Sequence, residues 1–443
     1  MEVVVKILQG YFMFTIIVMV VYAIRHFRFT YNRLFGKQRV SYRDLYDSEL
    51  PKVTVMIPMH NEEAVVHNVI NSLLECDYDR DKLEIIPIND HSEDKTTEIV
   101  NAYAKEYPFI KPIHRVGDGE RGKPVGLNDA LKVATGEVII VFDADYRPSK
   151  NLIKKLASAF KDPQVGAVMG RVIPINAKKN LLTVLLNLER SGGYQIDQQA
   201  RYNMRLLPQY GGTVGGFRKS IMLATGGFDT KVLAEDTELT YRLYSQGWTV
   251  VYDNSAECYE ESPETWEVRG KQIRRWSRGH NEVLFKYFFK FLLTRKMRFG
   301  EKLDGMLLLL VYAVPFILGL AQIDCLLLFF LGRMDILAGW GVLLFLGVYN
   351  TWGNFAPFFE IGAGAFLDGM DDELLALPNL CFSFYFYMWY ISLGFIDAIV
   401  DRVTHRSVKW NKTVRFNKEQ KAGKEQKVGG EAQANREQQA NQE

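Results

Sequence analysis

Two carboxylates, Asp143 and Asp145, stand one residue apart directly after the apolar run 138–142. An uninterrupted apolar run of this length is typical of a strand buried on both faces, as in a parallel sheet. Ligands of open α/β sheets bind beyond the carboxyl ends of such strands. Two acids at that place suit a hard divalent cation that holds a phosphate-bearing substrate. The competing interpretation is an acidic turn, because Asp is common in turns.

Further acidic side chains stand at the ends of elements that the pattern places in the same sheet. Glu62 follows an expected strand at 53–57, Asp90 follows an expected strand at 83–88, and Glu235 and Asp236 open an expected helix. Each position carries little information by itself. Together they predict a polar site along one edge of the sheet.

The elements around these acids alternate between strand and helix, which predicts a doubly wound, mostly parallel α/β sheet. Pro87 is expected at a bulge or near a strand end, because proline lacks the N–H that a ladder needs. The expected strands lie at 53–57, 83–88, 110–114, 138–142, 167–173 and 248–252, and the expected helices at 63–74, 96–107, 124–134 and 149–160.

Two glycine-rich stretches interrupt this pattern. One covers 117–123 and ends in Lys123, and the other covers 210–218 and contains Gly212 and Thr213. Glycine allows a backbone to approach a ligand closely, so the second stretch is expected beside a bound substrate.

The chain has 443 residues and a net charge of +2, and this balance points to no nucleic-acid partner. Residues 50–280 have the composition of a soluble domain, whereas 11–24 and most of 305–400 are apolar. This division predicts a soluble domain inserted between membrane segments. The four cysteines form no C-x-x-C pair, so neither a disulfide framework nor a zinc site is expected.

The apolar segments predict a multi-pass protein of the plasma or inner membrane. The basic residues that follow 11–24 place the N-terminus outside and the next domain in the cytoplasm. Spans are expected near 305–331, 335–352 and 378–400. A cytoplasmic C-terminus requires an even number of crossings after the domain, and these three do not provide it.

The expected domains follow from these segments. They are a transmembrane helix at 1–28, a cytoplasmic linker at 29–50, a catalytic domain at 51–280, an amphipathic interface helix at 281–302, a transmembrane bundle at 303–402 with an interfacial or re-entrant segment near 353–377, a loop at 403–417 and a disordered tail at 418–443.

The D-x-D at 143–145, the Glu235–Asp236 pair and the Q-x-x-R-W at 272–276 occur in an order that resembles family 2 glycosyltransferases with the GT-A fold. More narrowly, they resemble the processive membrane synthases of cellulose, hyaluronan, chitin and poly-N-acetylglucosamine. The resemblance covers about residues 50–280. It implies an α/β GT-A domain that is Rossmann-like and mostly parallel.

The resemblance also implies a role for each matching residue. Asp236 is the expected catalytic base, with Glu235 beside it, and Asp143 and Asp145 are the expected ligands of Mg²⁺ or Mn²⁺. Donor binding is expected from Pro58, Asn61, Glu62, Asp90, Lys123, Asp143, Gln272, Arg275, Trp410, Thr413 and Arg415, and acceptor binding from Trp276, Gly212 and Thr213.

The sequence departs from the family pattern at two positions. The usual T-E-D has Ala234 in place of threonine, which changes local hydrogen bonding but leaves the base in place. Ile273 stands where Gln or Arg is common.

In the loop at 403–417, Trp410, Thr413 and Arg415 resemble the W-x-x-T-x-R sequence of a gating loop.

One base without a second carboxylate nucleophile favours a single displacement that inverts the sugar. We therefore expect a β-linked polysaccharide, foremost a β-glucan made from UDP-glucose and threaded across the bilayer, with accessory secretion subunits as further partners. The runner-up within the class is UDP-N-acetylglucosamine, giving a chitin-like chain. Two hypotheses from different classes are a non-processive transferase onto polyprenyl phosphate, which lacks Q-x-x-R-W, and a scaffold or transporter with an inactive transferase domain.

Overall fold

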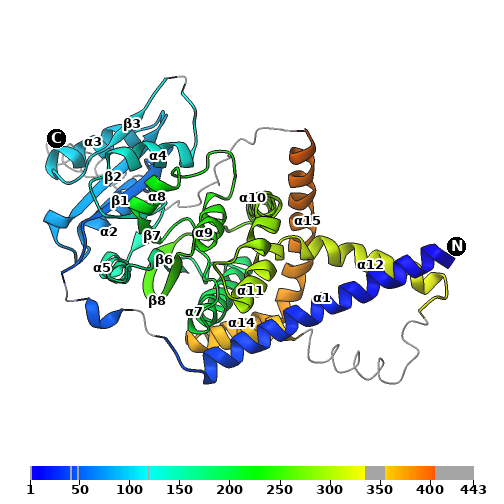
Figure 1. Ribbon diagram of the computed structural model, residues 1–443. Helices are drawn as coiled ribbons and strands as arrows, with labels where there is room; N and C mark the ends of the chain where they lie inside the picture. Colours follow the sequence, from blue (N-terminus) through cyan, green and yellow to red (C-terminus); the bar gives the residue numbers. More distant parts are fainter. Residues whose placement is uncertain (1, 40–41, 47–48, 118, 335–354, 405–443) are drawn as a thin grey trace, which may run out of the picture.

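The computed structural model describes residues 2–39, 42–46, 49–117, 119–334 and 355–404. An eight-stranded mixed sheet lies at the centre of the domain (Figure 1). Its strands are β1 Val53–Met59, β2 Leu83–Asp90, β3 Ile113–Arg115, β4 Val138–Val141, β5 Arg147–Pro148, β6 Val165–Pro174, β7 Gly215–Arg218 and β8 Thr249–Glu260. The predicted span near 335–352, the residues Trp410, Thr413 and Arg415, and the tail at 418–443 lie outside the described residues.

The strand order is β3-β2-β1-β4-β7-β6-β8-β5. The first four strands run parallel, which confirms the α/β prediction, and β6 pairs with β8 in parallel as well. β7 runs antiparallel to both of its neighbours, and β5 runs antiparallel to β8. The carboxyl ends of β1, β2 and β4 therefore meet at one edge, where the predicted site lies.

Helices cover both faces of the sheet. The described helices are α1 Glu2–Phe35, α2 Val66–Leu74, α3 Thr96–Glu106, α4 Lys123–Val133, α5 Leu152–Ser158, α6 Leu181–Ser191, α7 Gln199–Asn203, α8 Lys219–Ala224, α9 Glu235–Gln246, α10 Trp266–Leu293, α11 Phe299–Leu310, α12 Val314–Phe330, α14 Ala356–Leu367 and α15 Leu380–Thr404, with a π-helix, η4, at Gly192–Gln198. In β1, Val53 and Val55 pack with α2 and α5, whereas Met56 packs with α4 and α9. Burial on both faces explains why the run is continuously apolar.

β7 is a strand that the sequence pattern does not predict, because its glycines suggest a loop against a ligand. A Cβ on Gly215 would lie 2.5 Å from the carbonyl oxygen of Val168, and one on Gly216 would lie 2.5 Å from that of Ile139. These two glycines therefore let β7 fit between β6 and β4. Only the preceding part of the stretch, at Gly212, reaches the site.

Pro87 lies inside β2 without a shift of register against β1, so the predicted bulge is absent there. The neighbouring residues show why the missing N–H is tolerated. Ile85 and His91 direct their N–H groups toward the β3 side, to the carbonyls of Phe109 and Arg115. Pro87 has the same orientation, because alternate residues face the same neighbour. It falls between the Ile85–Ile110 bridge and the start of β3, where the ladder is interrupted.

Two stretches of the described chain are long and apolar enough to cross a membrane, Glu2–Phe35 and Glu373–Thr404. A third exists if α11 and α12 count as one span, but these helices meet at an angle of 67°. The span predicted near 305–331 therefore consists of two helices with a sharp bend, and its crossing of a membrane stays a prediction. Pro315 in the first turn of α12 accounts for the break, because proline lacks the N–H that would continue the preceding helix.

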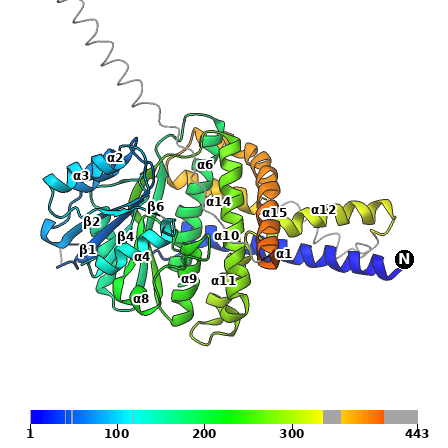
Figure 2. The ribbon, with the colours of Figure 1, turned by 90° about the horizontal axis from the view of Figure 1, so that it is seen from above.

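α1 and α12 lie side by side and project away from the sheet (Figures 1 and 2). The boundaries expected at 28 and 280 both fall within continuous helices, since α1 extends to Phe35 and α10 covers Trp266–Leu293. α14, from the segment left open near 353–377, packs against α1 and η4.

A largely buried ionic cluster joins α1 to the domain that contains the sheet. Arg25 of α1 lies 2.9 Å from Asp197 and 3.1 Å from Asp304. Arg201 contacts the same two carboxylates at 2.6 and 3.1 Å. Because two cations meet two anions here, each buried charge has a partner. The cluster fixes the register of α1, η4 and α11.

Close glycine contacts join α10 to α15. A Cβ on Gly394 of α15 would lie 2.5 Å from the Arg274 carbonyl oxygen, and one on Gly270 of α10 would lie 2.6 Å from the Tyr390 ring. Backbone contact of this kind allows little adjustment. α15 is therefore held rigidly against the helix that carries Q-x-x-R-W.

The Gly394→Ala substitution is expected to destabilise the protein by about 1–3 kcal/mol, because an added methyl must displace backbone. Thermal unfolding of the purified protein in detergent measures this effect. Gly319→Ala in α12 is the matched control, since nothing lies within 4 Å of its added Cβ. Equal melting temperatures for the two variants would contradict the packing described here.

Candidate functional site

Lys123 lies at the centre of the predicted site. It is the first residue of α4, and its Nζ lies 3.0 Å from Asp143 Oδ1 and 3.5 Å from Glu235 Oε1. The same Nζ donates to the Gly212 carbonyl oxygen at 3.4 Å. Three positions that are far apart in the sequence therefore meet around one cation. The sequence places these residues in one site, and their roles in binding stay predictions.

Local structure places the acidic groups at this cation. Asp143 follows β4, at the carboxyl edge of the parallel strands. Glu235 and Asp236 are the first two residues of α9. The partial positive charge of a helix N-terminus stabilises carboxylates there. The sheet and the helix thus bring negative charge to Lys123 from two sides.

Asp236 is constrained by its backbone neighbours. Thr237 N–H donates to Asp236 Oδ1 at 2.6 Å. Gly212 has φ +75°, and a Cβ there would lie 3.0 Å from Asp236 Oδ2. Burial, together with the adjacent Glu235 carboxylate, raises the pKa of Asp236 to about 6. A base with this pKa is ionised at neutral pH and still able to take a proton.

The charges of the site balance one another. Burial alone would lower the pKa of Lys123, but the carboxylates of Asp143 and Glu235 raise it above its ordinary value. Burial lowers the pKa of Arg275, against the opposing effect of Glu235, Asp143 and Asp236. Both cations stay charged at physiological pH. They can therefore stabilise a diphosphate that leaves with growing negative charge.

Q-x-x-R-W lies on α10, and the structure adds a residue to it. Arg269 donates to Gln272 Oε1 at 2.9 Å, and its guanidinium lies 5.2 Å from the centre of the Trp276 ring. One face of Trp276 is therefore covered. Sequence analysis missed Arg269, although its spacing of three residues before Gln272 on one helix face is a usable signal.

Two further residues lie near the site: Tyr210, which opens the glycine-rich stretch at 210–218, and Glu189, which the sequence analysis does not name as a site residue. Tyr210 is fully buried, and burial, followed by the charges of Asp236, Glu235 and Asp143, raises its pKa well above the ordinary value. Glu189 of α6 contacts Arg269 at 3.5 Å. Glu189 belongs to no motif with fixed spacing, so only the fold brings it here.

The loops after β1 and β2 are joined by hydrogen bonds. Asn61 has φ +54°, and its Oδ1 accepts from Glu93 N–H at 2.7 Å while its own N–H donates to Ser92 Oγ at 2.9 Å. Glu62 is buried, and its N–H donates to Thr96 Oγ1 at 2.9 Å. With Pro58 near the end of β1, the loops form one wall beside the site.

Asp90 fastens the glycine-rich loop to this wall. Its Oδ1 accepts from Arg115 Nη1 at 2.7 Å and contacts His91 Nδ1 at 2.7 Å, while its Oδ2 accepts from Gly122 N–H at 2.9 Å. Gly122 immediately precedes Lys123. A nucleoside bound at Asp90 would therefore have to share the carboxylate oxygens with Arg115, His91 and Gly122. Binding of the nucleotide sugar by Asp90 remains a prediction.

Asp143 and Asp145 could supply only some of the ligands that a divalent cation needs. Carboxylate oxygens suit Mg²⁺ and Mn²⁺, and the Asp143 side chain is 34% exposed, so a ligand can reach it. Within the described ranges no group of three or more His, Cys, Asp or Glu side chains forms a metal site. The remaining ligands would have to come from the bound diphosphate and water.

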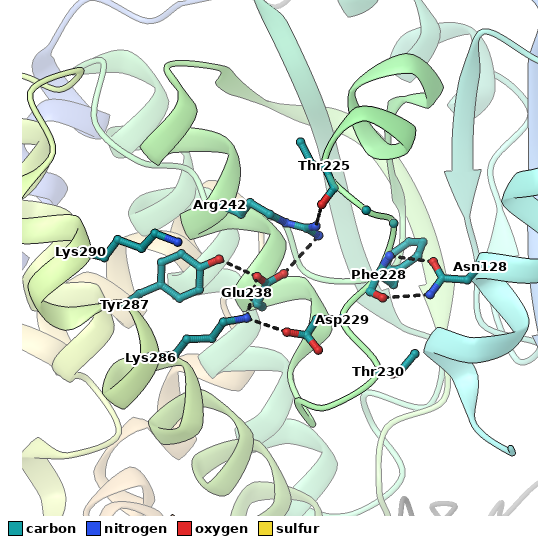
Figure 3. Close-up of a pocket in the computed structure, with 12 residues that line it drawn as sticks. Asn128, Thr225, Phe228, Asp229, Thr230, Glu238, Arg242, Lys286, Tyr287 and Lys290 are labelled. Carbon is teal, nitrogen blue, oxygen red and sulfur yellow. Dashed lines mark hydrogen bonds and ion pairs between the residues drawn. The ribbon is translucent and has the colours of Figure 1, made fainter.

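A separate pocket of about 480 Å³ lies between α4, the loop at 225–230, α9 and α10 (Figure 3). Glu238 at its base contacts Tyr287 Oη at 2.6 Å, Lys286 at 3.2 Å and Arg242 at 3.2 Å. Glu238 is two residues beyond Asp236, so the helix turns it away from the site. Its charge is matched by its own neighbours, and we assign the pocket a structural role.

Comparison with known proteins agrees with this geometry. Residues 51–279 match the model of the family described as glycosyltransferase like family 2, and the chain belongs to that family. The probable glycosyltransferase YdaM of Bacillus subtilis is 38% identical over 276 residues, which are 62% of this chain and 64% of that protein. The β-monoglucosyldiacylglycerol synthase of Trichormus variabilis is 28% identical over 283 residues, which are 64% of this chain and 60% of that enzyme. The chain thus aligns with less than two thirds of the length of these curated relatives.

A solved structure supports the fold. The mannosyltransferase PcManGT of Pyrobaculum calidifontis, solved with GDP-Man and Mn²⁺, superposes with a TM-score of 0.55 at 21% identity, over 82% of this chain and 99% of that one. The similarity establishes a GT-A-like fold.

Glu235→Gln is expected to move the pH dependence of sugar transfer. The base must be deprotonated, so the rate should rise through pH about 6 and level off above it. Removing the neighbouring negative charge lowers the pKa of Asp236, and the rising limb should move to lower pH. The measurement is kcat/KM for donor turnover over a pH range from about two units below to about two units above that midpoint.

Glu267→Gln is the control, because Glu267 is exposed on α10 and pairs only with Lys271 among the contacts described. It should leave the midpoint in place. A midpoint that stays fixed or rises in Glu235→Gln would show that Asp236 is not the titrating base.

Proposed function

We propose that the chain is an inverting glycosyltransferase that uses a nucleotide sugar, UDP-glucose foremost, and polymerises a β-glucan. One observation carries the transferase assignment: Lys123 contacts both Asp143 and Glu235, beside Asp236. The groups expected to hold the donor diphosphate and the group expected to activate the acceptor therefore share one site. Family membership supports the same reaction class.

The proposed reaction is a single displacement. The acceptor hydroxyl oxygen forms a bond to the anomeric carbon while the bond from that carbon to the diphosphate oxygen breaks. Asp236 takes the hydroxyl proton, and the electron pair leaves on the nucleoside diphosphate. Lys123 and Arg275 stabilise the charge on that leaving group. An α-linked donor gives a β-linked product.

Asp143 and Asp145 are the residues proposed to hold Mg²⁺ or Mn²⁺ with the donor. The cation would supply charge neutralisation at the diphosphate. PcManGT, which shares the fold, was solved with Mn²⁺. Lys123 already neutralises part of the charge of Asp143, so binding of the donor and of the cation should depend on each other.

Polymerisation is supported by the relation of α10 to the apolar helices. Q-x-x-R-W lies where α10 packs against α15, which is part of a stretch able to span a membrane. A chain leaving Asp236 past Trp276 would therefore start beside the bilayer. In this proposal the catalytic domain and the C-terminus are cytoplasmic, the protein is multi-pass, and accessory secretion subunits receive the polymer on the far side.

A second candidate is transfer of glucose to a membrane lipid. The observation that favours it is the relation to β-monoglucosyldiacylglycerol synthase, at 28% identity. The hydroxyl of diacylglycerol would then take the place of the growing glycan. Transfer of N-acetylglucosamine remains the alternative for the polymer, and transfer to polyprenyl phosphate is disfavoured by Gln272–Trp276.

Product analysis separates these functions. Protein purified in detergent is incubated with radiolabelled UDP-glucose or UDP-N-acetylglucosamine, Mg²⁺ or Mn²⁺, and diacylglycerol in mixed micelles. The proposal expects label from UDP-glucose in a polymer that a β-glucanase degrades. Label extracted by organic solvent would identify the lipid function instead.

The control for that assay is Asp236→Asn, which keeps the shape of the base and removes its proton affinity. It should lower product formation by about 10²–10⁴-fold. Full activity in this variant, or no product from any donor with the natural sequence, would contradict the proposal.

Removing the divalent cation should abolish transfer. With EDTA the rate should fall to background, because the cation neutralises the leaving diphosphate, and added Mn²⁺ or Mg²⁺ should restore it. Asp145→Asn should raise the Mn²⁺ concentration needed for half-maximal rate, whereas Asp229→Asn, outside the site, should not. Full activity in EDTA would argue against a metal-dependent reaction.

A further inference from the structure

A polar and aromatic cluster lies at the junction of α6, α10 and α15, next to the site described above. Arg269 Nη2 lies 3.5 Å from Glu189 Oε2, and Tyr387 donates to the same oxygen at 3.2 Å. The guanidinium of Arg269 lies 5.0 Å from the centre of the Tyr387 ring and 5.2 Å from that of Trp276. Three helices distant in the sequence thus build one largely buried cluster.

The contacts leave one atom of the cluster without a partner. Both interactions of Glu189 use Oε2, while Oε1 is buried and has no hydrogen-bond partner among the described residues. A buried carboxylate oxygen without a donor costs free energy, so such atoms usually mark the place of a ligand or an ordered water. Burial also raises the pKa of Glu189, against the opposing charge of Arg269.

The cluster is connected to the catalytic base. Tyr312, between α11 and α12, packs against the same apolar cluster around Tyr387 as Trp276 does, and it lies within electrostatic range of Asp236, Arg269 and Glu189. Trp276 follows Arg275, whose guanidinium lies within range of the same base. A molecule in contact with Glu189 would therefore lie near Trp276, the residue expected to bind the acceptor.

The chemistry of the surface fits a sugar ring. A pyranose presents hydroxyl donors and acceptors around its edge and an apolar C–H face. A carboxylate oxygen takes the donors, a guanidinium supplies donors of its own, and aromatic rings contact the C–H face. Diacylglycerol offers a single hydroxyl, and it would leave most of this polar surface unused.

We propose that Glu189, held in place by Arg269 and Tyr387, binds a hydroxyl of the terminal sugar of the acceptor and thereby selects a glycan as the acceptor. The proposal rests on the transferase function proposed above. Because Tyr387 comes from α15, the acceptor site is complete only when that apolar helix is packed on α10. Glu189 is a positioning and specificity residue, and it takes no part in bond formation.

The experiment compares the natural sequence with Glu189→Gln and Tyr387→Phe, all full length in detergent. Binding of cellotetraose, a β-linked glucose oligosaccharide, is titrated calorimetrically in the presence of UDP. The ratio of transfer onto cellotetraose to hydrolysis of UDP-glucose is measured in parallel. Both variants are expected to weaken cellotetraose binding about tenfold or more and to lower the ratio equally, since a hydrogen bond to a charged group is lost.

Glu267→Gln is again the matched control, because it removes an exposed carboxylate from α10 and should leave binding and ratio unchanged. A purely structural role for Glu189 predicts instead that transfer and hydrolysis fall together and that the melting temperature drops. That result, or absence of cellotetraose binding by the natural sequence, would overturn the proposal. The proposal would also be overturned if Glu189→Gln and Tyr387→Phe lowered only the transfer onto diacylglycerol, measured in the mixed-micelle assay described above.

A different result would contradict the proposed transferase function and leave the role of Glu189 open to test. If the natural sequence neither hydrolyses nor transfers any nucleotide sugar, the function is wrong, while calorimetric binding of cellotetraose still decides the role of Glu189.

Discussion

The site depends on the ion contacts of Lys123. Three carboxylates in a partly buried site repel one another and lose hydration, and both effects disfavour their ionised forms. Lys123 offsets this cost by contacting Asp143 and Glu235 together. The compensation is incomplete at Asp236, whose pKa stays raised to about 6. Asp236 therefore takes up a proton more readily than an ordinary aspartate, which is a property that a general base at neutral pH would need.

This balance depends on backbone features more than on the acids themselves. Asp90 holds Gly122, and Gly122 positions the start of α4 and therefore Lys123. Gly212 lets the chain pass close to Asp236, since a Cβ added there would lie 3.0 Å from that carboxylate. Substitutions at these supporting positions would alter the charge balance without touching a charged group of the site. The loops that carry Gly122 and Gly212 therefore help to set the charge balance of the site, although they contribute no charged group to it.

The sequence predicts those parts of the fold that follow a period or a motif. The continuous apolar runs of β1 and β4 identify buried parallel strands, and the acids after them identify the edge that carries the site. β7 could not be predicted because its glycines are required by close contacts with the backbone of Ile139 and Val168, and these contacts exist only in the folded sheet. The bend between α11 and α12 escapes prediction because Pro315 stands within a longer apolar run. Glu189 escapes it because no fixed spacing connects it to Arg269, 80 residues later in the chain.

The arrangement of α10 explains why catalytic and apolar parts occur in one chain. α10 carries Arg275, which lies within electrostatic range of Glu235, Asp143 and Asp236. It also carries Arg269, which belongs to the cluster with Glu189, and Gly270, which packs against Tyr390 of α15. At the other edge of the domain, Arg25 of α1 shares Asp197 and Asp304 with Arg201. A displacement of either apolar helix must therefore move residues that pack toward Asp236. Because rigid packing transmits such shifts, the packing of the apolar helices and the geometry of the site are mechanically linked.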